Sequence, residues 1–115
     1  FKKYYDNEAD YQYEYFYILP KSTSIKSVSA AKKGFTVKYK KQATQTTGYQ
    51  IKYATDKKFK KNVKAVTVKK NSTTSAKVKG LKSKKKYYVR VRTYKTVSGK
   101  KYYSSWSSTK SVKTK

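Results

Sequence analysis

Hydrophobic and polar residues alternate along much of the chain, and the clearest alternation follows Leu81. In an extended strand, successive side chains point to opposite faces of the sheet. One face of this segment would carry Tyr87, Val89 and Val91. The other would carry Tyr88, Arg90, Arg92 and Tyr94. A strand with one apolar and one wet face is typical of an antiparallel sheet that covers a core. We predict that this strand is central to the fold.

Turn signals divide the rest of the chain at regular distances. Four glycines (Gly34, Gly48, Gly80, Gly99) and the polar run at residues 71–74 separate the alternating segments. The strands predicted between these breaks cover residues 25–31, 35–41, 48–54, 63–69, 75–79, 86–97 and 102–113. Short strands at this spacing, without a helical period, predict an all-β antiparallel sandwich of seven strands.

The same alternation names the expected core. Its members are Val28, Phe35, Val37, Tyr39, Tyr49, Ile51, Tyr53, Val66, Val68, Ala76, Val78, Leu81, Tyr87, Val89, Val91 and Val112. Burial of each larger side chain stabilises the fold by about 1.5–3 kcal/mol. Phe59, within the polar stretch 56–62, is expected to pin the connection between the third and fourth strands.

Charge divides the chain at Pro20. The sequence has 31 Lys and Arg against 5 Asp and Glu, and residues 1–20 hold 2 of the basic and 4 of the acidic residues. The body at 21–115 therefore holds 29 basic residues and Asp56 as its one acid. Such a charge disfavours self-association and favours contact with polyanions. Since Cys and His are absent, disulfides, thiolate chemistry and the commonest general base are excluded.

Residues 22–114 resemble a fibronectin type III domain of the Lys-rich kind found in secreted and cell-surface proteins of Gram-positive bacteria. The resemblance is carried by 34–39, 48–53, Leu81 with 87–92, and 103–107. It implies an immunoglobulin-like sandwich in which the Tyr87 hydroxyl returns to the preceding turn, a tyrosine corner. The chain departs from the family at Tyr39, where Trp is usual, and at Ser83, where Pro is common. It also lacks the integrin-binding Arg-Gly-Asp tripeptide.

Residues 1–20 form a separate acidic, Tyr-rich segment before the domain at 21–115. Alternation over residues 11–18 predicts an extra N-terminal strand. The segment resembles the end of a preceding module in bacterial arrays. Alternatively, it is a donated strand that adds to a sheet edge of this or another copy of the chain. The residues that would add are Tyr11, Tyr13, Tyr15, Phe16, Tyr17 and Ile18. Because the chain begins with Phe, we interpret it as a processed product or an excised fragment.

The outward residues of the central strand form the candidate functional face. Tyr88, Arg90, Arg92 and Tyr94 would share it with Trp106, delivered by the last strand. Guanidinium groups stacked on an indole make cation–π contacts. The set resembles half of the Trp-Ser motif of cytokine-receptor fibronectin domains. Two interpretations stay open: a ladder that rigidifies the sheet, or a platform that binds glycans or polyanions.

No pattern in the sequence predicts catalysis, a metal or a cofactor. The basic body has no paired carboxylates and no Gly-rich phosphate loop. Residues 6–10 begin like a calcium loop, but Tyr11 stands where that loop requires Gly. Because the lysines are spread over every strand and loop, nucleic acid is expected to bind only non-specifically.

The resemblance to fibronectin type III domains, together with the lack of Cys and His and the basic surface, implies a non-catalytic extracellular module, a spacer or adhesion unit of a bacterial surface or secreted protein. The alternatives are a self-assembling filament subunit, through residues 11–18, and a domain that binds glycans or anionic cell-wall polymers. The expected partners are neighbouring domains, other copies of the chain and such polymers. Membrane insertion is not expected, because no apolar run is long enough to span a bilayer.

Overall fold

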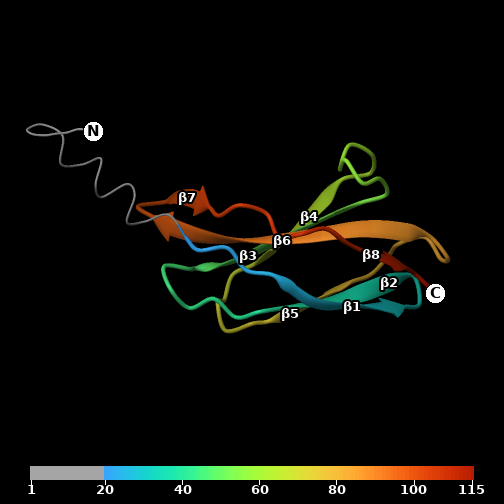
Figure 1. The fold of residues 1–115 in the computed structure, drawn as a ribbon, viewed down its shortest axis with the longest axis horizontal. Coiled ribbons are helices and arrows are strands. Elements are labelled where there is room, and N and C mark those ends of the chain that lie inside the picture. The colour runs from blue at the N-terminus through green and yellow to red at the C-terminus, as the bar shows by residue number, and fades with distance from the viewer. Residues whose placement is uncertain (1–19) are drawn as a thin grey trace, which may run out of the picture.

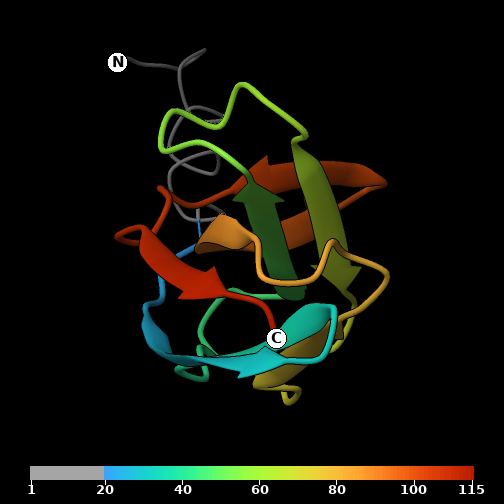
Figure 2. The same cartoon turned by 90° about the vertical axis from the view of Figure 1, so that its right-hand side faces the viewer.

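Two antiparallel sheets face each other in the computed structural model, which describes residues 20–115 (Figure 1). The strands of this part of the chain are β1 (Ile25–Ala31), β2 (Gly34–Tyr39), β3 (Gly48–Ala54), β4 (Lys64–Val68), β5 (Ser75–Val78), β6 (Lys86–Val97), β7 (Lys100–Tyr103) and β8 (Lys110–Lys113). One sheet has the order β1-β2-β5, and the other has the order β4-β3-β6-β7 with β8 also beside β6. Figure 2 shows the two layers end-on. The predicted all-β, immunoglobulin-like sandwich is confirmed.

The predicted extra strand at residues 11–18 lies outside the described residues. Its donation to a sheet edge, and the boundary drawn at Pro20, therefore stay predictions.

The longest strand, β6, is paired along both of its edges. On one edge it pairs with β3, from Gly48 opposite Tyr94 to Ala54 opposite Tyr88. On the other edge it pairs with β8 near its start and with β7 near its end. The predicted central strand is thus confirmed, but the single strand predicted at 102–113 is wrong. Residues 104–109 separate β7 from β8 because serine side chains replace the backbone hydrogen bonds of a regular ladder there.

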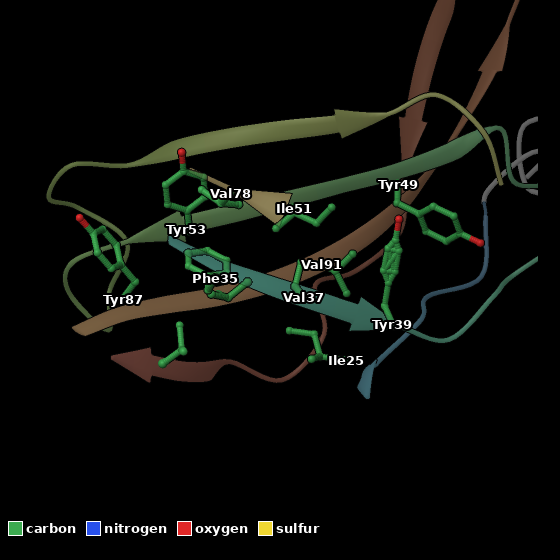
Figure 3. Close-up of a cluster of buried hydrophobic side chains, with 12 residues drawn as sticks. Ile25, Phe35, Val37, Tyr39, Tyr49, Ile51, Tyr53, Val78, Tyr87 and Val91 are labelled. Carbon is green, nitrogen blue, oxygen red and sulfur yellow. The ribbon is translucent and has the colours of Figure 1, made fainter. Parts of the chain in front are cut away.

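The core between the sheets is aromatic at both ends (Figure 3). The predicted core positions that are buried are Phe35, Val37, Tyr39, Tyr49, Ile51, Tyr53, Val78, Tyr87, Val89, Val91 and Val112. The remaining predicted positions are partly buried and pack against them: Val28, Val66, Val68, Ala76 and Leu81. These five lie on the outer strands or their connections, where one sheet no longer fully covers the other.

Ile25 belongs to this core although the alternation did not place it there. A register irregularity between Ile25 and Ser27 shifts the pattern, so that Ile25 and Val28 both face inward. A bulge of this kind inserts one residue and reverses the alternation that follows it. The strict period of two therefore could not identify both residues.

The predicted tyrosine corner is present at Tyr87. Its ring is buried and its hydroxyl accepts a hydrogen bond from the backbone N–H of Lys82 (3.3 Å). Thr114 closes the same turn, because its hydroxyl accepts from the Lys85 N–H (2.9 Å) and donates to the Lys82 carbonyl (2.6 Å). The turn that leads into β6 is thus fixed both by β6 itself and by the segment that follows β8.

Lys21 and Lys115, near the two ends of the described chain, are tied to opposite ends of the sandwich (Figure 1). Near the start, the Thr93 hydroxyl donates to the Lys21 carbonyl (2.6 Å). At the other end, Lys115 donates its N–H to the Ala31 carbonyl (3.0 Å) and accepts from the Lys33 N–H (3.1 Å). That pattern is the one made by parallel strands. The two points at which the chain enters and leaves the described sandwich are therefore separated by the length of the sandwich.

Two stacked tyrosines in the core differ in how their hydroxyls are satisfied. The Tyr39 and Tyr49 ring centroids are 4.5 Å apart. The Tyr49 hydroxyl donates to the Asn71 carbonyl (2.7 Å) and accepts from the Gln42 N–H (2.8 Å). The Tyr39 hydroxyl is buried and has no hydrogen-bond partner among the described residues. Burial, and then the neighbouring Tyr49, raises the pKa of Tyr39 well above its ordinary value.

We expect Tyr39→Phe to raise the free energy of unfolding by about 1 kcal/mol at neutral pH, because a buried hydroxyl without a partner is removed. Above the ordinary tyrosine pKa of 10.0, the unfolded chain loses a proton that folded Tyr39 retains. The stability of the native protein therefore falls as the pH rises through and beyond this value, and the variant should lose less. Urea unfolding between pH 7 and pH 11 measures both effects.

Tyr49→Phe is the matched control. It should lower the free energy of unfolding by about 1–3 kcal/mol, because its two hydrogen-bond partners are left unsatisfied. Equal destabilisation by both substitutions would contradict the difference between the two hydroxyls.

Candidate binding face

A stack of alternating rings and guanidinium groups covers the outer face of β6. Its members are, in order, Phe59, Arg90, Trp106, Arg92 and Tyr103, and we call this set the ladder. The Arg90 Cζ lies 4.2 Å from the Phe59 ring centroid and 4.6 Å from that of Trp106. The Arg92 Cζ lies 4.3 Å from the Trp106 centroid and 3.7 Å from that of Tyr103. Contacts of this length are well within the range of cation–π attraction.

Serine side chains place Trp106 in the ladder. Ser104 and Thr93 exchange two hydrogen bonds of 3.0 Å: the Ser104 N–H donates to the Thr93 carbonyl, and the Thr93 N–H donates to the Ser104 hydroxyl. Ser107 makes the same pair with Val91, at 2.8 and 3.0 Å. Three steps along the chain, from Ser104 to Ser107, thus match two steps along β6, from Thr93 to Val91. This mismatch in step lets the Trp106 side chain lie over β6 between the two serines.

The two arginines lie on opposite sides of the Trp106 ring. Residues two apart on one face of a strand are separated by about 7 Å, which leaves room for one aromatic ring between their side chains. Beyond the stack, the Arg92 Nε donates to the Gln50 Oε1 (2.8 Å), while the Arg90 Nε is buried without a hydrogen-bond partner in the described part of the chain. Burial lowers the pKa of Arg92, an effect that Tyr103 opposes. Both faces of Trp106 are occupied, which favours the interpretation as a structural ladder.

Arg90 and Arg92 are the only arginines in the sequence, beside 29 lysines. A guanidinium group is planar and weakly hydrated, so it stacks between rings at a lower desolvation cost than an ammonium group. Lys52, a lysine near the stack, keeps its Nζ 5.6 Å from the Trp106 centroid. The two positions that lie between aromatic rings are therefore occupied by arginine, the basic residue best suited to stacking.

Tyr94 was predicted to face solvent and does not. It lies on the outer face in register, yet it is only 3% exposed. A Cβ at Gly48, its partner on β3, would lie 3.0 Å from the Tyr94 ring and hydroxyl, so Tyr94 packs across the glycine. The Tyr103 ring, 6.3 Å away, and the Lys101 Nζ, 5.0 Å away, cover it further. Burial, and then Tyr103, raises the pKa of Tyr94.

Two members of the ladder were not predicted. Phe59 was expected only as a plug for the loop after β3, and it is indeed buried there, but its ring also stacks on Arg90. Tyr103 ends β7 and comes beside Arg92 because β7 pairs with the far end of β6. Neither position follows from the alternation of β6. The sequence signal for Tyr103 is its closeness to the Ser-Ser-Trp-Ser run.

Tyr88, the remaining predicted residue, lies outside the ladder. It is half-buried, and the Lys86 Nζ lies 5.4 Å from its ring centroid. An open hollow beside it is lined by Lys57, Lys86, Tyr88, Thr109, Lys110 and Ser111. Tyr88 is therefore surrounded by lysine and hydroxyl side chains, whereas Arg90 and Arg92 are surrounded by aromatic rings.

Within residues 20–115, no group of three or more His, Cys, Asp or Glu side chains is placed to hold a metal ion. Over the same residues, no helix has the length and apolar character needed to cross a bilayer.

Comparison with protein families identifies the fold. The family model of the fibronectin type III domain matches residues 20–110. The chain belongs to the fibronectin type III family. The ladder is thus carried by a fibronectin type III domain, on the strand that also makes the tyrosine corner.

Comparison with solved structures supports the same fold. The domain is similar to part of a crystal structure of a β-1,2-glucanase from Parabacteroides distasonis, with a TM-score of 0.66 and 17% sequence identity. The match covers 84% of this chain and 14% of the glucanase chain. At this identity the similarity shows the fold alone. No curated protein matches the chain.

We expect Trp106→Ala to lower the free energy of unfolding by about 2–3 kcal/mol, because two cation–π contacts and the burial of the indole are lost together. Urea unfolding followed by circular dichroism measures this. Tyr88→Ala, which leaves the ladder intact, should cost less than half as much. Equal effects of the two substitutions would contradict a stabilising role for the ladder.

We expect Ser107→Ala to destabilise the domain by about 1–3 kcal/mol, because the Val91 N–H loses its acceptor on a covered strand edge. The fluorescence of Trp106, the only tryptophan, should shift to longer wavelength as the segment loosens. Ser108→Ala is the matched control, since only the Ser108 carbonyl takes part in the hydrogen bonds here. A spectrum unchanged by Ser107→Ala would show that the hydroxyl does not position the indole.

Proposed function

We propose that this fibronectin type III domain is a non-catalytic extracellular module, a spacer or adhesion unit in a bacterial surface or secreted protein. Its partners would be the neighbouring domains of the same chain. The observation that carries the proposal is the attachment of Lys21 and Lys115 to opposite ends of the sandwich, through Thr93 at one end and through Ala31 and Lys33 at the other. A unit built in this way holds its two points of attachment apart by the length of the sandwich.

The hydrogen bonds at the two ends support a load-bearing role. Tension applied to the ends would act along β1 and along the segment at Lys115, which pairs with it in a parallel sense. Such tension loads the two backbone hydrogen bonds of Lys115 together, in shear, instead of opening them one at a time. The ladder adds side-chain contacts from β6 to the segment before β8 and to the loop after β3.

The size of the domain relative to a structural neighbour also supports the proposal. A domain of this fold occupies 14% of a much longer glucanase chain. A sandwich of this fold can thus be one part of a larger enzyme. We propose that the domain is likewise a non-catalytic part of a longer chain.

Single-molecule stretching between the two termini tests the spacer role. The domain should unfold in one cooperative step that releases about 300 Å of chain, as expected for the roughly 95 described residues. Trp106→Ala should lower the unfolding force. Gradual extension without a force peak would contradict a load-bearing spacer.

An activity assay tests the other half of the proposal. The purified chain should release no sugar from β-1,2-glucan, because the described residues hold no paired carboxylates that could act as acid and base. Measurable hydrolysis that is absent from the buffer control, and that a substitution in the chain abolishes, would overturn the assignment as non-catalytic.

A further inference from the structure

The hollow beside Tyr88 is built from three separate parts of the chain. Lys86 and Tyr88 come from β6, Thr109, Lys110 and Ser111 come from β8 and the residue before it, and Lys57 comes from the loop between β3 and β4. Its volume is about 470 Å³. Pockets of this size are typical of sites for small ligands or for a few units of a polymer.

The hollow is positively charged, and no acidic side chain among its lining residues neutralises that charge. Three of its six lining residues are lysines and none is acidic. The one acid of residues 20–115 is Asp56, next to Lys57. Its Oδ1 accepts hydrogen bonds from the backbone N–H groups of Lys60 and Lys61, both 2.8 Å. These bonds, that from Lys61 most of all, lower the pKa of Asp56 and engage it in its own loop.

The non-ionic groups of the hollow are an aromatic ring and hydroxyls. Tyr88 and Ser111 are direct partners across β6 and β8, so their side chains lie on the same face of the sheet. Thr109 adds a second aliphatic hydroxyl. A ring face packs against the C–H groups of a sugar, hydroxyls exchange hydrogen bonds with it, and ammonium groups bind a phosphate or carboxylate that it carries.

We propose that this hollow binds an anionic glycan, with a sugar ring against Tyr88 and its phosphate or carboxylate among Lys57, Lys86 and Lys110. The ligand class follows from charge complementarity together with the aromatic surface. The site is separate from the ladder, in which the indole already has a guanidinium group on each side. Glycan binding would be an activity beyond the spacer role, and the domain could serve as a spacer without it.

The test must separate this site from the general attraction of a chain with a net charge of +26. Binding to the full chain is measured by calorimetry at a salt concentration of about 0.15 M, where attraction between exposed charges more than about 8 Å apart is largely screened. The probes are an oligogalacturonate, a phosphodiester-linked glucose oligomer, inorganic polyphosphate and uncharged dextran. The first two distinguish carboxylate from phosphate as the anionic group, and polyphosphate reports charge without a sugar.

Tyr88→Ala should weaken the binding of at least one anionic glycan by about tenfold, as is usual for truncation of a central aromatic contact. It should leave the binding of polyphosphate within about twofold of the native value, because no lysine is lost. Tyr102→Ala is the matched control. The Tyr102 ring also has a lysine Nζ, that of Lys100, at 5.4 Å, but it is not among the residues that line the hollow. It should bind both glycans like the native chain.

A second pair of variants addresses the charges without disturbing the ring. Lys110→Gln should weaken glycan binding several-fold more than Lys26→Gln, which removes the same charge from exposed surface on β1. Tyr88→Phe, which keeps the ring, should bind like the native chain and fold normally. Equal losses for Tyr88→Ala and Tyr102→Ala, equal losses for the two lysine variants, or glycan binding no tighter than that of polyphosphate would each overturn the proposal.

Discussion

The structure depends on β6, which is packed on both faces and paired along both edges. Its inward residues complete the core, and its outward arginines enter the ladder. One edge pairs with β3, and the other pairs with β8, two serine hydroxyls and β7 in turn. A covered backbone N–H without an acceptor costs about as much as a lost hydrogen bond. The serines therefore matter as much as the strands, because they continue the edge where regular pairing stops.

The ladder also shows how this very basic chain distributes its charges. Lysines supply 29 of the 31 basic residues, and most of them lie exposed on strands and turns, where their ammonium groups stay hydrated. The two arginines lie together on β6, where like charges would repel each other across a short distance. The Trp106 ring offsets this repulsion, because each guanidinium group makes a cation–π contact with it. Replacing either arginine by lysine would keep the charge and lose the planar stacking.

The sequence predicted those parts of the fold that follow from a period of two. The central strand, the tyrosine corner and most of the core are of this kind, because each is decided by residues close together in the chain. Ile25 was missed because a bulge reverses the period. The break between β7 and β8 was missed because a serine hydroxyl can accept the bond that a carbonyl would, and an alternating pattern does not reveal which one does.

The candidate site was predictable only in part for a similar reason. Arg90 and Arg92 share a face by period, and Trp106 could be assigned to them by the nature of indole–guanidinium contacts. Phe59 and Tyr103 are brought in by pairings between strands far apart in sequence. Tyr94 shares the same face by period, but its burial depends on the absence of a side chain at Gly48. Contacts of this kind are set by tertiary structure, which a local pattern does not contain.

The loop between β3 and β4 connects the ladder to the hollow beside Tyr88. The Asp56 carboxylate accepts two backbone N–H groups, and its carbonyl accepts the N–H of Phe59 (3.2 Å), so one residue shapes the turn. Phe59 has a φ of 55°, a conformation that costs a non-glycine residue about 1 kcal/mol or more, which its contact with Arg90 helps to offset. The same turn brings Lys57 to the hollow. Asp56, the single acid of residues 20–115, thus holds the turn that places Phe59 at one end of the ladder and Lys57 beside Tyr88. Loss of this turn would therefore weaken the ladder and remove a positive charge from the hollow at the same time.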